Sequence, residues 1–203
     1  MGTEKMQMHT NPRLVAKVLT KYRDTFYALK ELINNSLYAK ATRIDINFIP
    51  SEYDRDSVYY HLIDKIQIRD NGYGVSYTDF KKSIMVIATD NKSDGYGVGR
   101  FSALQIGRCM HISTTAYDET SKQYTKTEVN FDIRQFQKDD LQSKEFDVKY
   151  SVIEESHDTG YQVEISDLYT YDEKCKRKNK LGKEFTSEGF PQKLFESYPI
   201  YIF

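Results

Sequence analysis

The stretch Glu31-Leu-Ile-Asn-Asn35-Ser-Leu-Tyr-Ala39 decides the fold of this chain. Apolar residues recur every three or four positions through it and just before it: Phe26, Leu29, Ile33 and Leu37. That spacing predicts an amphipathic helix lying on a core. Glu31 and Asn35 are four residues apart, so both side chains project from one helical face. A carboxylate and a carboxamide so placed suit a general base beside a ligand for a hard metal ion. The alternative is a solvated polar stripe.

Composition predicts one globular domain. The chain has 203 residues, 39% of them hydrophobic and 29% charged, and its formal net charge is -1. That length is enough for a sizeable core, and the charge gives no global field favouring nucleic acid or membrane. No apolar run approaches the ~20 residues of a membrane span. No signal peptide is apparent, and Cys109 and Cys175 are expected to be reduced thiols, so the predicted location is cytoplasmic with no membrane partner.

A second stretch, Asp70-Asn-Gly72-Tyr-Gly74, directly follows a predicted strand. Glycines at such a point let the backbone approach a ligand closely. A buried aspartate there can accept a hydrogen bond from an exocyclic amine, which distinguishes adenine from guanine. The alternative is an ordinary tight turn.

A third stretch, Asp94-Gly95-Tyr-Gly97-Val98-Gly99-Arg100-Phe101, runs into a predicted helix over residues 99–106. Free N–H groups and the dipole at a helix N-terminus favour phosphate. A flexible hinge is the alternative. The stretch is not a Walker motif, because no Gly-Lys-Ser/Thr follows.

The remaining pattern predicts further helices and strands. Ser76 is expected to cap a helix over residues 77–84. Two more helices are expected at residues 14–22 and 190–197. Alternating or apolar runs predict strands at residues 42–48, 58–63, 65–69, 109–116, 124–131, 146–153 and 161–165. We expect a loose leader over residues 1–10, a main domain over 11–170, and a basic loop with the start of a following, truncated segment over 171–203.

These motifs, in this order, resemble the GHKL ATPases, which include gyrase B, the ninety-kilodalton heat-shock chaperone, histidine kinases and MutL. ELINNSLYAKATRIDI (residues 31–46) and IQIRDNGYGV (66–75) look most like MutL. GYGVGRFSALQIG (95–107) is similar to the lid of the heat-shock chaperone and the MORC ATPases. The resemblance implies an α+β fold. It is the Bergerat two-layer sandwich, with a mixed, largely antiparallel sheet covered by helices on one face.

The resemblance also implies a site for ATP and Mg²⁺. Glu31 is then the catalytic base that activates water, Asn35 the magnesium ligand, and Asp70 the reader of the adenine amine. Residues 89–99 are then a lid over the nucleotide. The remaining nucleotide-binding residues implied are Gly72, Gly74, Gly95, Gly97, Val98, Gly99, Arg100, Phe101 and Thr159.

Two positions depart from the family pattern. Tyr38 stands where the family usually has an acidic residue, three positions after the magnesium asparagine. The later Gly-Thr pair, whose hydroxyl supports the adenine aspartate, is replaced by Thr159-Gly160-Tyr161. Either Thr159 shifts into place or Tyr161 substitutes for it.

The function implied is an ATPase module whose lid closure drives conformational change or a nucleotide-dependent homodimer within a larger protein, in DNA-related or defence processes. A module that binds ATP without turnover is the alternative. A histidine kinase is disfavoured, because those domains generally lack the base glutamate. The basic run at residues 174–183 suits either contact with nucleic acid or simple solvation.

Overall fold

The architecture comes from a computed structural model that describes residues 1–8, 25–50, 63–86, 99–136, 145–154, 158–169 and 189–199. The predicted helix over residues 14–22, the strand residues 58–62, Cys175 and the basic run at 174–183 lie outside these ranges. So do Gly95, Gly97 and Val98 of the predicted lid.

A seven-stranded sheet forms one layer of the described structure, in the order β1-β6-β5-β4-β7-β3-β2. Every described pair of neighbouring strands is antiparallel. The strands are β1 (Gly2–Gln7), β2 (Ile44–Pro50), β3 (Ile63–Asp70), β4 (Gly107–Asp118), β5 (Gln123–Asp132), β6 (Glu145–Ile153) and β7 (Gly160–Leu168).

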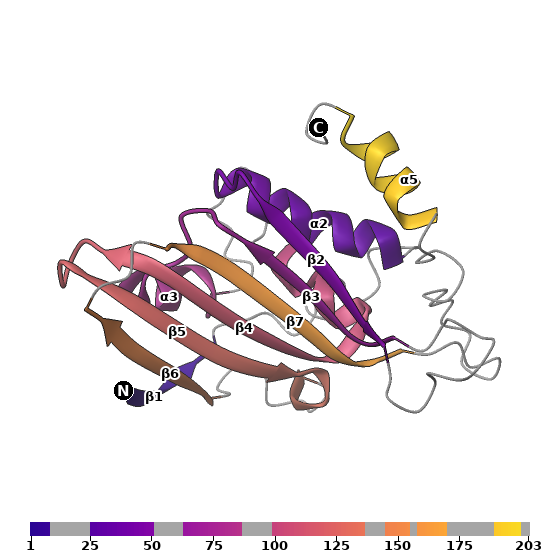
Figure 1. Ribbon diagram of the computed structural model, residues 1–203. Helices are drawn as coiled ribbons and strands as arrows, with labels where there is room; N and C mark the ends of the chain where they lie inside the picture. Colours follow the sequence, from indigo (N-terminus) through magenta and orange to yellow (C-terminus); the bar gives the residue numbers. More distant parts are fainter. Residues whose placement is uncertain are drawn as a thin grey trace.

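Helices form the second layer, and Figure 1 shows α2 lying along the half of the sheet that contains β2 and β3. The helical elements are α2 (Thr25–Tyr38), α3 (Tyr77–Ser83), the 3₁₀ segments η2 (Gly99–Gln105) and η3 (Ile133–Phe136), and α5 (Gly189–Ser197). The predicted α+β two-layer sandwich is confirmed, but the expectation of a mixed sheet is wrong for the described strands, which pair only antiparallel.

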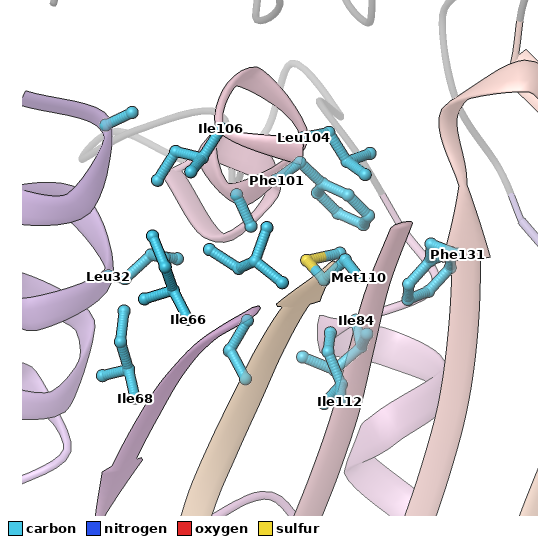
Figure 2. Packing of buried hydrophobic residues seen from close by; sticks show 14 of the residues in the cluster. Leu32, Ile66, Ile68, Ile84, Phe101, Leu104, Ile106, Met110, Ile112 and Phe131 are labelled. Carbon is cyan, nitrogen blue, oxygen red and sulfur yellow. The ribbon is translucent and has the colours of Figure 1, made fainter. Parts of the chain in front are cut away.

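The core lies between the layers, as Figure 2 shows. Leu32 of α2 is buried there with Ile66 and Ile68 of β3, which are two residues apart and therefore point to the same face. Phe101 of η2 meets Phe131 of β5 edge to face, with ring centroids 5.4 Å apart. Burying a side chain of this size contributes about 1.5–3 kcal/mol. This packing holds α2 and η2 against the sheet.

The N-terminal expectation is wrong for residues 2–7. We expected a loose leader, but Gly2–Gln7 forms β1 and pairs with β6, from Gly2 opposite Tyr150 to Gln7 opposite Glu145. Met6 and Met8 are buried in the core. A short polar strand of this kind is stabilised by its distant partner, and the local pattern does not reveal it.

Ser76 caps α3 as predicted. Its side chain accepts a hydrogen bond from the backbone N–H of Asp79 at 3.2 Å, in the extended conformation typical of an N-cap. Thr78, the second residue of α3, is held by Asp118 at the end of β4: the Asp118 carboxylate accepts from the Thr78 hydroxyl at 2.7 Å and from its N–H at 3.1 Å. Both contacts fix α3 beside the hairpin of β4 and β5.

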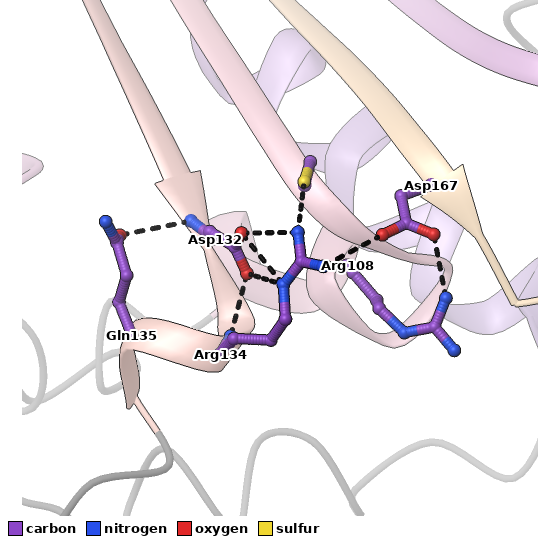
Figure 3. A network of polar contacts seen from close by, with 6 residues as sticks. Arg108, Asp132, Arg134, Gln135 and Asp167 are labelled. Atoms are coloured by element: carbon purple, nitrogen blue, oxygen red, sulfur yellow. Dashed lines mark hydrogen bonds and ion pairs between the residues drawn. The ribbon is translucent and has the colours of Figure 1, made fainter.

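A charged network joins η3 to the sheet (Figure 3). Arg134 pairs with Asp132 at 2.6 Å and reaches Asp167 of β7 at 3.7 Å. Arg108 of β4 also pairs with Asp167, at 2.7 Å. These groups are partly exposed, so each pair adds about 0–1 kcal/mol and serves mainly to register the strand ends.

Candidate nucleotide site

Asp70, the last residue of β3, is buried, with 5% of its surface exposed. One carboxylate oxygen accepts from the Ser36 hydroxyl of α2 at 2.6 Å, and the other accepts from the Gly72 N–H at 2.9 Å. A carboxylate offers about four acceptor positions, so each oxygen retains a lone pair. Asp70 is therefore a fixed acceptor that can take a further hydrogen bond.

The Gly72–Gly74 turn requires glycine. Gly74 has a φ of 65°, and a Cβ there would lie 2.2 Å from the Thr115 carbonyl oxygen. At Gly72 a Cβ would lie 2.6 Å from the carbonyl oxygen of Ala39, at the end of α2. The turn after β3 is thus pressed between α2 and β4, which sets Asp70 close to the helix.

Two threonines hold this turn from the sheet side. The Thr114 hydroxyl of β4 accepts from the Val75 N–H at 2.8 Å and donates to the Gly160 carbonyl at 3.1 Å. The Thr159 hydroxyl donates to the Gly72 carbonyl at 2.7 Å. Thr159 therefore supports the turn backbone and makes no hydrogen bond to Asp70.

Tyr161 occupies the position opposite Asp70. The register of β3 and β7 pairs these two residues directly, and both side chains point to the helix side of the sheet. Burial raises the pKa of the Tyr161 hydroxyl, so the phenol stays protonated at neutral pH. Neither of the two hydroxyls that the sequence offered as support for Asp70 reaches its carboxylate: Thr159 donates to the Gly72 carbonyl, and the Tyr161 hydroxyl has no hydrogen-bond partner among the described residues.

The predicted catalytic face of α2 lies beside the start of η2. A Cβ on Gly99 would lie 2.9 Å from a carboxylate oxygen of Glu31 and 3.9 Å from the amide oxygen of Asn35. Glu31 is partly exposed and Asn35 is exposed, and neither side chain makes a hydrogen bond within the described part of the chain. Both are therefore accessible to a ligand.

A cavity of about 170 Å³ is lined by both Asn35 and Asp70. Its walls come from α2, the turn after β3, the end of α3, η2 and β7. The lining residues are Asn35, Ala39, Asp70, Gly74, Val75, Ser83, Ile84, Arg100 and Tyr161. The magnesium-ligand candidate and the base-reading candidate thus face one space.

Arg100 is the cation of this cavity. Its guanidinium donates to the Ser83 carbonyl, and none of the described carboxylates forms an ion pair with it. Burial lowers its pKa. A partly buried charge with no counter-ion among the described residues is costly to keep, so the site favours an anionic ligand.

Other predicted residues are placed differently. The Phe101 side chain is buried in the core with 4% exposed, so only its backbone is available to a ligand. Tyr38 is 83% exposed and is not among the residues that line the cavity. The sequence analysis did not identify Ser36 or Thr114 as residues of the site. Ser36 had one signal, because it lies four residues after the apolar Leu32 and so on the buried face of α2.

The donor set fits Mg²⁺ with a nucleotide. Among the described residues no cluster of three or more metal-ligating side chains occurs. Mg²⁺ typically uses one or two protein oxygens together with water and substrate phosphates, which is what Asn35 beside Glu31 offers. None of the described helices is both long and apolar enough to cross a membrane.

Comparison with known proteins identifies one family. The family model described as histidine kinase-, DNA gyrase B-, and HSP90-like ATPase matches residues 22–159. That range runs from just before α2 to Thr159, directly before β7, and includes Glu31, Asn35, Asp70 and Gly99. No curated protein matches the chain.

Proposed function

The chain belongs to the histidine kinase-, DNA gyrase B- and HSP90-like ATPase family, and from that membership we propose that it binds ATP with Mg²⁺ in the cavity between α2 and β7 and hydrolyses it. The observation that carries the proposal is the arrangement at this cavity. Asp70 and Asn35 both line it, and Glu31 and Gly99 lie beside Asn35.

Asp70 is proposed to bind the adenine base of the nucleotide. Its carboxylate is fixed by Ser36 and Gly72, and an ionised carboxylate accepts hydrogen bonds but donates none. The exocyclic amine of adenine donates to such a group, whereas the carbonyl oxygen at the same position of guanine does not. Gly74 lines the same cavity and leaves room for the flat ring.

The phosphate end is proposed to lie beside Glu31. Glu31 is proposed to accept a proton from the attacking water, because a positioned carboxylate commonly acts as a general base. Backbone N–H groups of Gly99, Arg100 and Phe101 are then proposed to donate to the phosphates. Gly72, in the turn after β3, is proposed as a further nucleotide contact. Gly95, Gly97 and Val98 are proposed as further lid contacts but lie outside the described residues.

The metal is proposed to be held by Asn35 through its amide oxygen. Bound there, Mg²⁺ supplies charge neutralisation to the phosphates. Thr159 is proposed to act indirectly on nucleotide binding. Its hydroxyl donates to the Gly72 carbonyl and so holds the turn in place. In the wider protein, nucleotide-dependent lid closure and homodimerisation are proposed to follow, in DNA-related or defence processes.

Turnover is tested by comparing wild type with Glu31→Gln, which keeps the shape of the side chain and removes the base. We expect wild type to release phosphate from Mg-ATP. The variant should bind ATP with similar affinity and lose about 100-fold or more in turnover, the usual contribution of a general base. Equal turnover in both proteins would remove Glu31 from the mechanism.

A non-turnover ATP sensor is the second candidate function. It is favoured by Tyr38, which stands at the family's acidic position and is exposed to solvent. Tight Mg-ATP binding by wild type without phosphate release, in the full-length protein with its partners, would select it. Glu31 argues for hydrolysis instead, because a site that only binds has no need of a base.

A further inference from the structure

The Tyr161 hydroxyl is one of only two buried side-chain polar atoms without a hydrogen-bond partner among the described residues. The other is the hydroxyl of Thr127, on β5. Buried polar groups are normally paired, and an orphan is costly to keep. The position of Tyr161 therefore calls for an explanation, and that explanation is found in what surrounds it.

Tyr161 lies between two groups of opposite charge. Asp70 is its direct neighbour across β3 and β7, and Arg100 lines the same cavity. Both charges act on the Tyr161 pKa, with Arg100 lowering it and Asp70 raising it, but burial dominates and raises it. The phenol is thus neutral and retains its proton to donate.

Asp70 does not use that proton. Its oxygens accept from Ser36 and Gly72, and although each retains a lone pair, the Tyr161 hydroxyl makes no hydrogen bond to either of them. Arg100 has donors only and offers no acceptor. Within the described cavity the Tyr161 proton therefore has no acceptor, whereas a bound ligand can supply one.

The ligand that fits has a donor next to an acceptor on one edge. The cavity of about 170 Å³ is smaller than the roughly 300–1,000 Å³ of sites that enclose a whole drug-sized ligand. It suits the flat base alone, with sugar and phosphates extending outward. Adenine presents an exocyclic amine flanked by two ring nitrogens, N1 and N7, which are both acceptors.

We propose that Tyr161 is the specificity-determining donor of this site and gives its hydroxyl proton to a ring nitrogen beside the amine that Asp70 accepts. The inference rests on the proposed function, because it takes the ligand to be an adenine nucleotide. It adds direct reading of a second atom of the base. The site then selects on an amine and on its neighbouring acceptor together.

The test is calorimetric titration of the full chain with Mg-ATP, 1-deaza-ATP and 7-deaza-ATP. Each analogue replaces one ring nitrogen by C–H. Wild type should bind one of the two analogues about five- to tenfold more weakly than ATP, as expected for one lost hydrogen bond. Tyr161→Phe should bind ATP five- to tenfold more weakly and bind that same analogue as well as it binds ATP.

The melting temperature of the ligand-free chain gives an independent test, because Tyr161→Phe should not lower it even though the same variant binds ATP more weakly. In the ligand-free chain the hydroxyl is unpaired, so Tyr161→Phe should leave the melting temperature unchanged or raised. Tyr198→Phe is the matched control. Its hydroxyl donates to the Lys30 carbonyl at 3.2 Å or to the Asn34 amide oxygen at 2.8 Å, outside the cavity lining. That variant should melt at a lower temperature and keep its ATP affinity.

The outcomes separate this inference from the proposed function. If wild type binds ATP and both analogues equally, or Tyr161→Phe binds ATP as tightly as wild type, Tyr161 does not read the base although ATP binding stands. If wild type binds none of the three at millimolar concentration, both proposals are wrong. The analogue comparison needs only wild type, so it decides the matter even if the variant folds poorly.

Discussion

The hydroxyl of Ser36 lies 2.6 Å from a carboxylate oxygen of Asp70, although the two residues are 34 positions apart in the chain. Both are buried, at 3% and 5% exposed. This hydrogen bond joins α2 to the end of β3. It therefore sets the distance between the Glu31–Asn35 face of the helix and the Asp70 carboxylate.

Ser36→Ala should destabilise the fold and weaken ATP binding. A hydrogen bond to a charged group contributes about 1.5–3 kcal/mol, and its loss leaves a buried carboxylate short of one donor. We expect urea unfolding to show a loss of about 2 kcal/mol, and titration to show weaker Mg-ATP binding. Both effects arise at Asp70.

Ser121→Ala is the control for that measurement. Ser121 is exposed, and it reaches Asp118 through its backbone N–H at 3.2 Å, a contact that alanine retains. Its stability should stay within about 0.5 kcal/mol of wild type. If Ser36→Ala is as stable as the control and binds ATP equally well, the link between α2 and β3 does not shape the site.

Gly74→Ala should be severely destabilising. The residue has a φ of 65°, and the added Cβ would meet the Thr115 carbonyl oxygen at 2.2 Å, which is backbone and cannot move aside. We expect a loss of about 3 kcal/mol or more. Thermal melting measures it, and a melting temperature equal to that of wild type would show that the turn tolerates a side chain.

Gly99→Ala should fold but lose turnover. The atom nearest to the new Cβ is a carboxylate oxygen of Glu31 at 2.9 Å, the free end of a flexible side chain that can shift. The melting temperature should change little. Phosphate release should fall about ten- to hundredfold, because a small displacement of a reacting group is costly. Full activity would place the reacting water away from Glu31.

The local motifs were predictable because each depends on residues close together in sequence. Apolar residues recurring every three to four positions predicted one helix carrying both Glu31 and Asn35, and Ser76 predicted the start of α3. The Asp70 turn also stood out, because only glycine tolerates the backbone that Gly74 adopts. The α+β class follows from this alternation of helical and strand patterns.

The long-range relationships were not predictable in the same way. β1 pairs with β6 across more than a hundred residues, and no local signal marks it. The hydrogen bonds from Ser36 to Asp70 and from Thr114 to Gly160 depend on which strands become neighbours. The opposition of Tyr161 to Asp70 is likewise set by the β3–β7 register. Register is fixed by tertiary packing rather than by short spacings.

Acid stability should depend on Asp118. Burial alone would raise the pKa of its carboxyl, but hydrogen bonds from Thr78, Ser121 and Thr120 outweigh burial and hold the pKa below its usual 3.8. A lowered folded-state pKa stabilises the fold above the unfolded value and loses that contribution as pH falls through the folded value. The effect of Asp118 should therefore disappear below about pH 4.

Urea unfolding of wild type and Asp118→Asn between about pH 2 and pH 7 measures this dependence. Wild type should be the more stable protein near neutral pH, and the difference should stay nearly constant down to about pH 4 and shrink only below it. A constant difference across the whole range would show that the ionised form of Asp118 is not what holds α3 to β4.

Comparing Mg-ATP binding by wild type and by Asp70→Asn tests whether the Asp70 carboxylate holds the adenine amine. The carboxamide keeps the size of the side chain but can turn its amide nitrogen towards the adenine amine, so a donor would meet a donor. We predict clear calorimetric binding by wild type and no measurable binding by a folded Asp70→Asn protein at millimolar ATP. Equal binding by the two proteins, or no binding by wild type, would contradict the account.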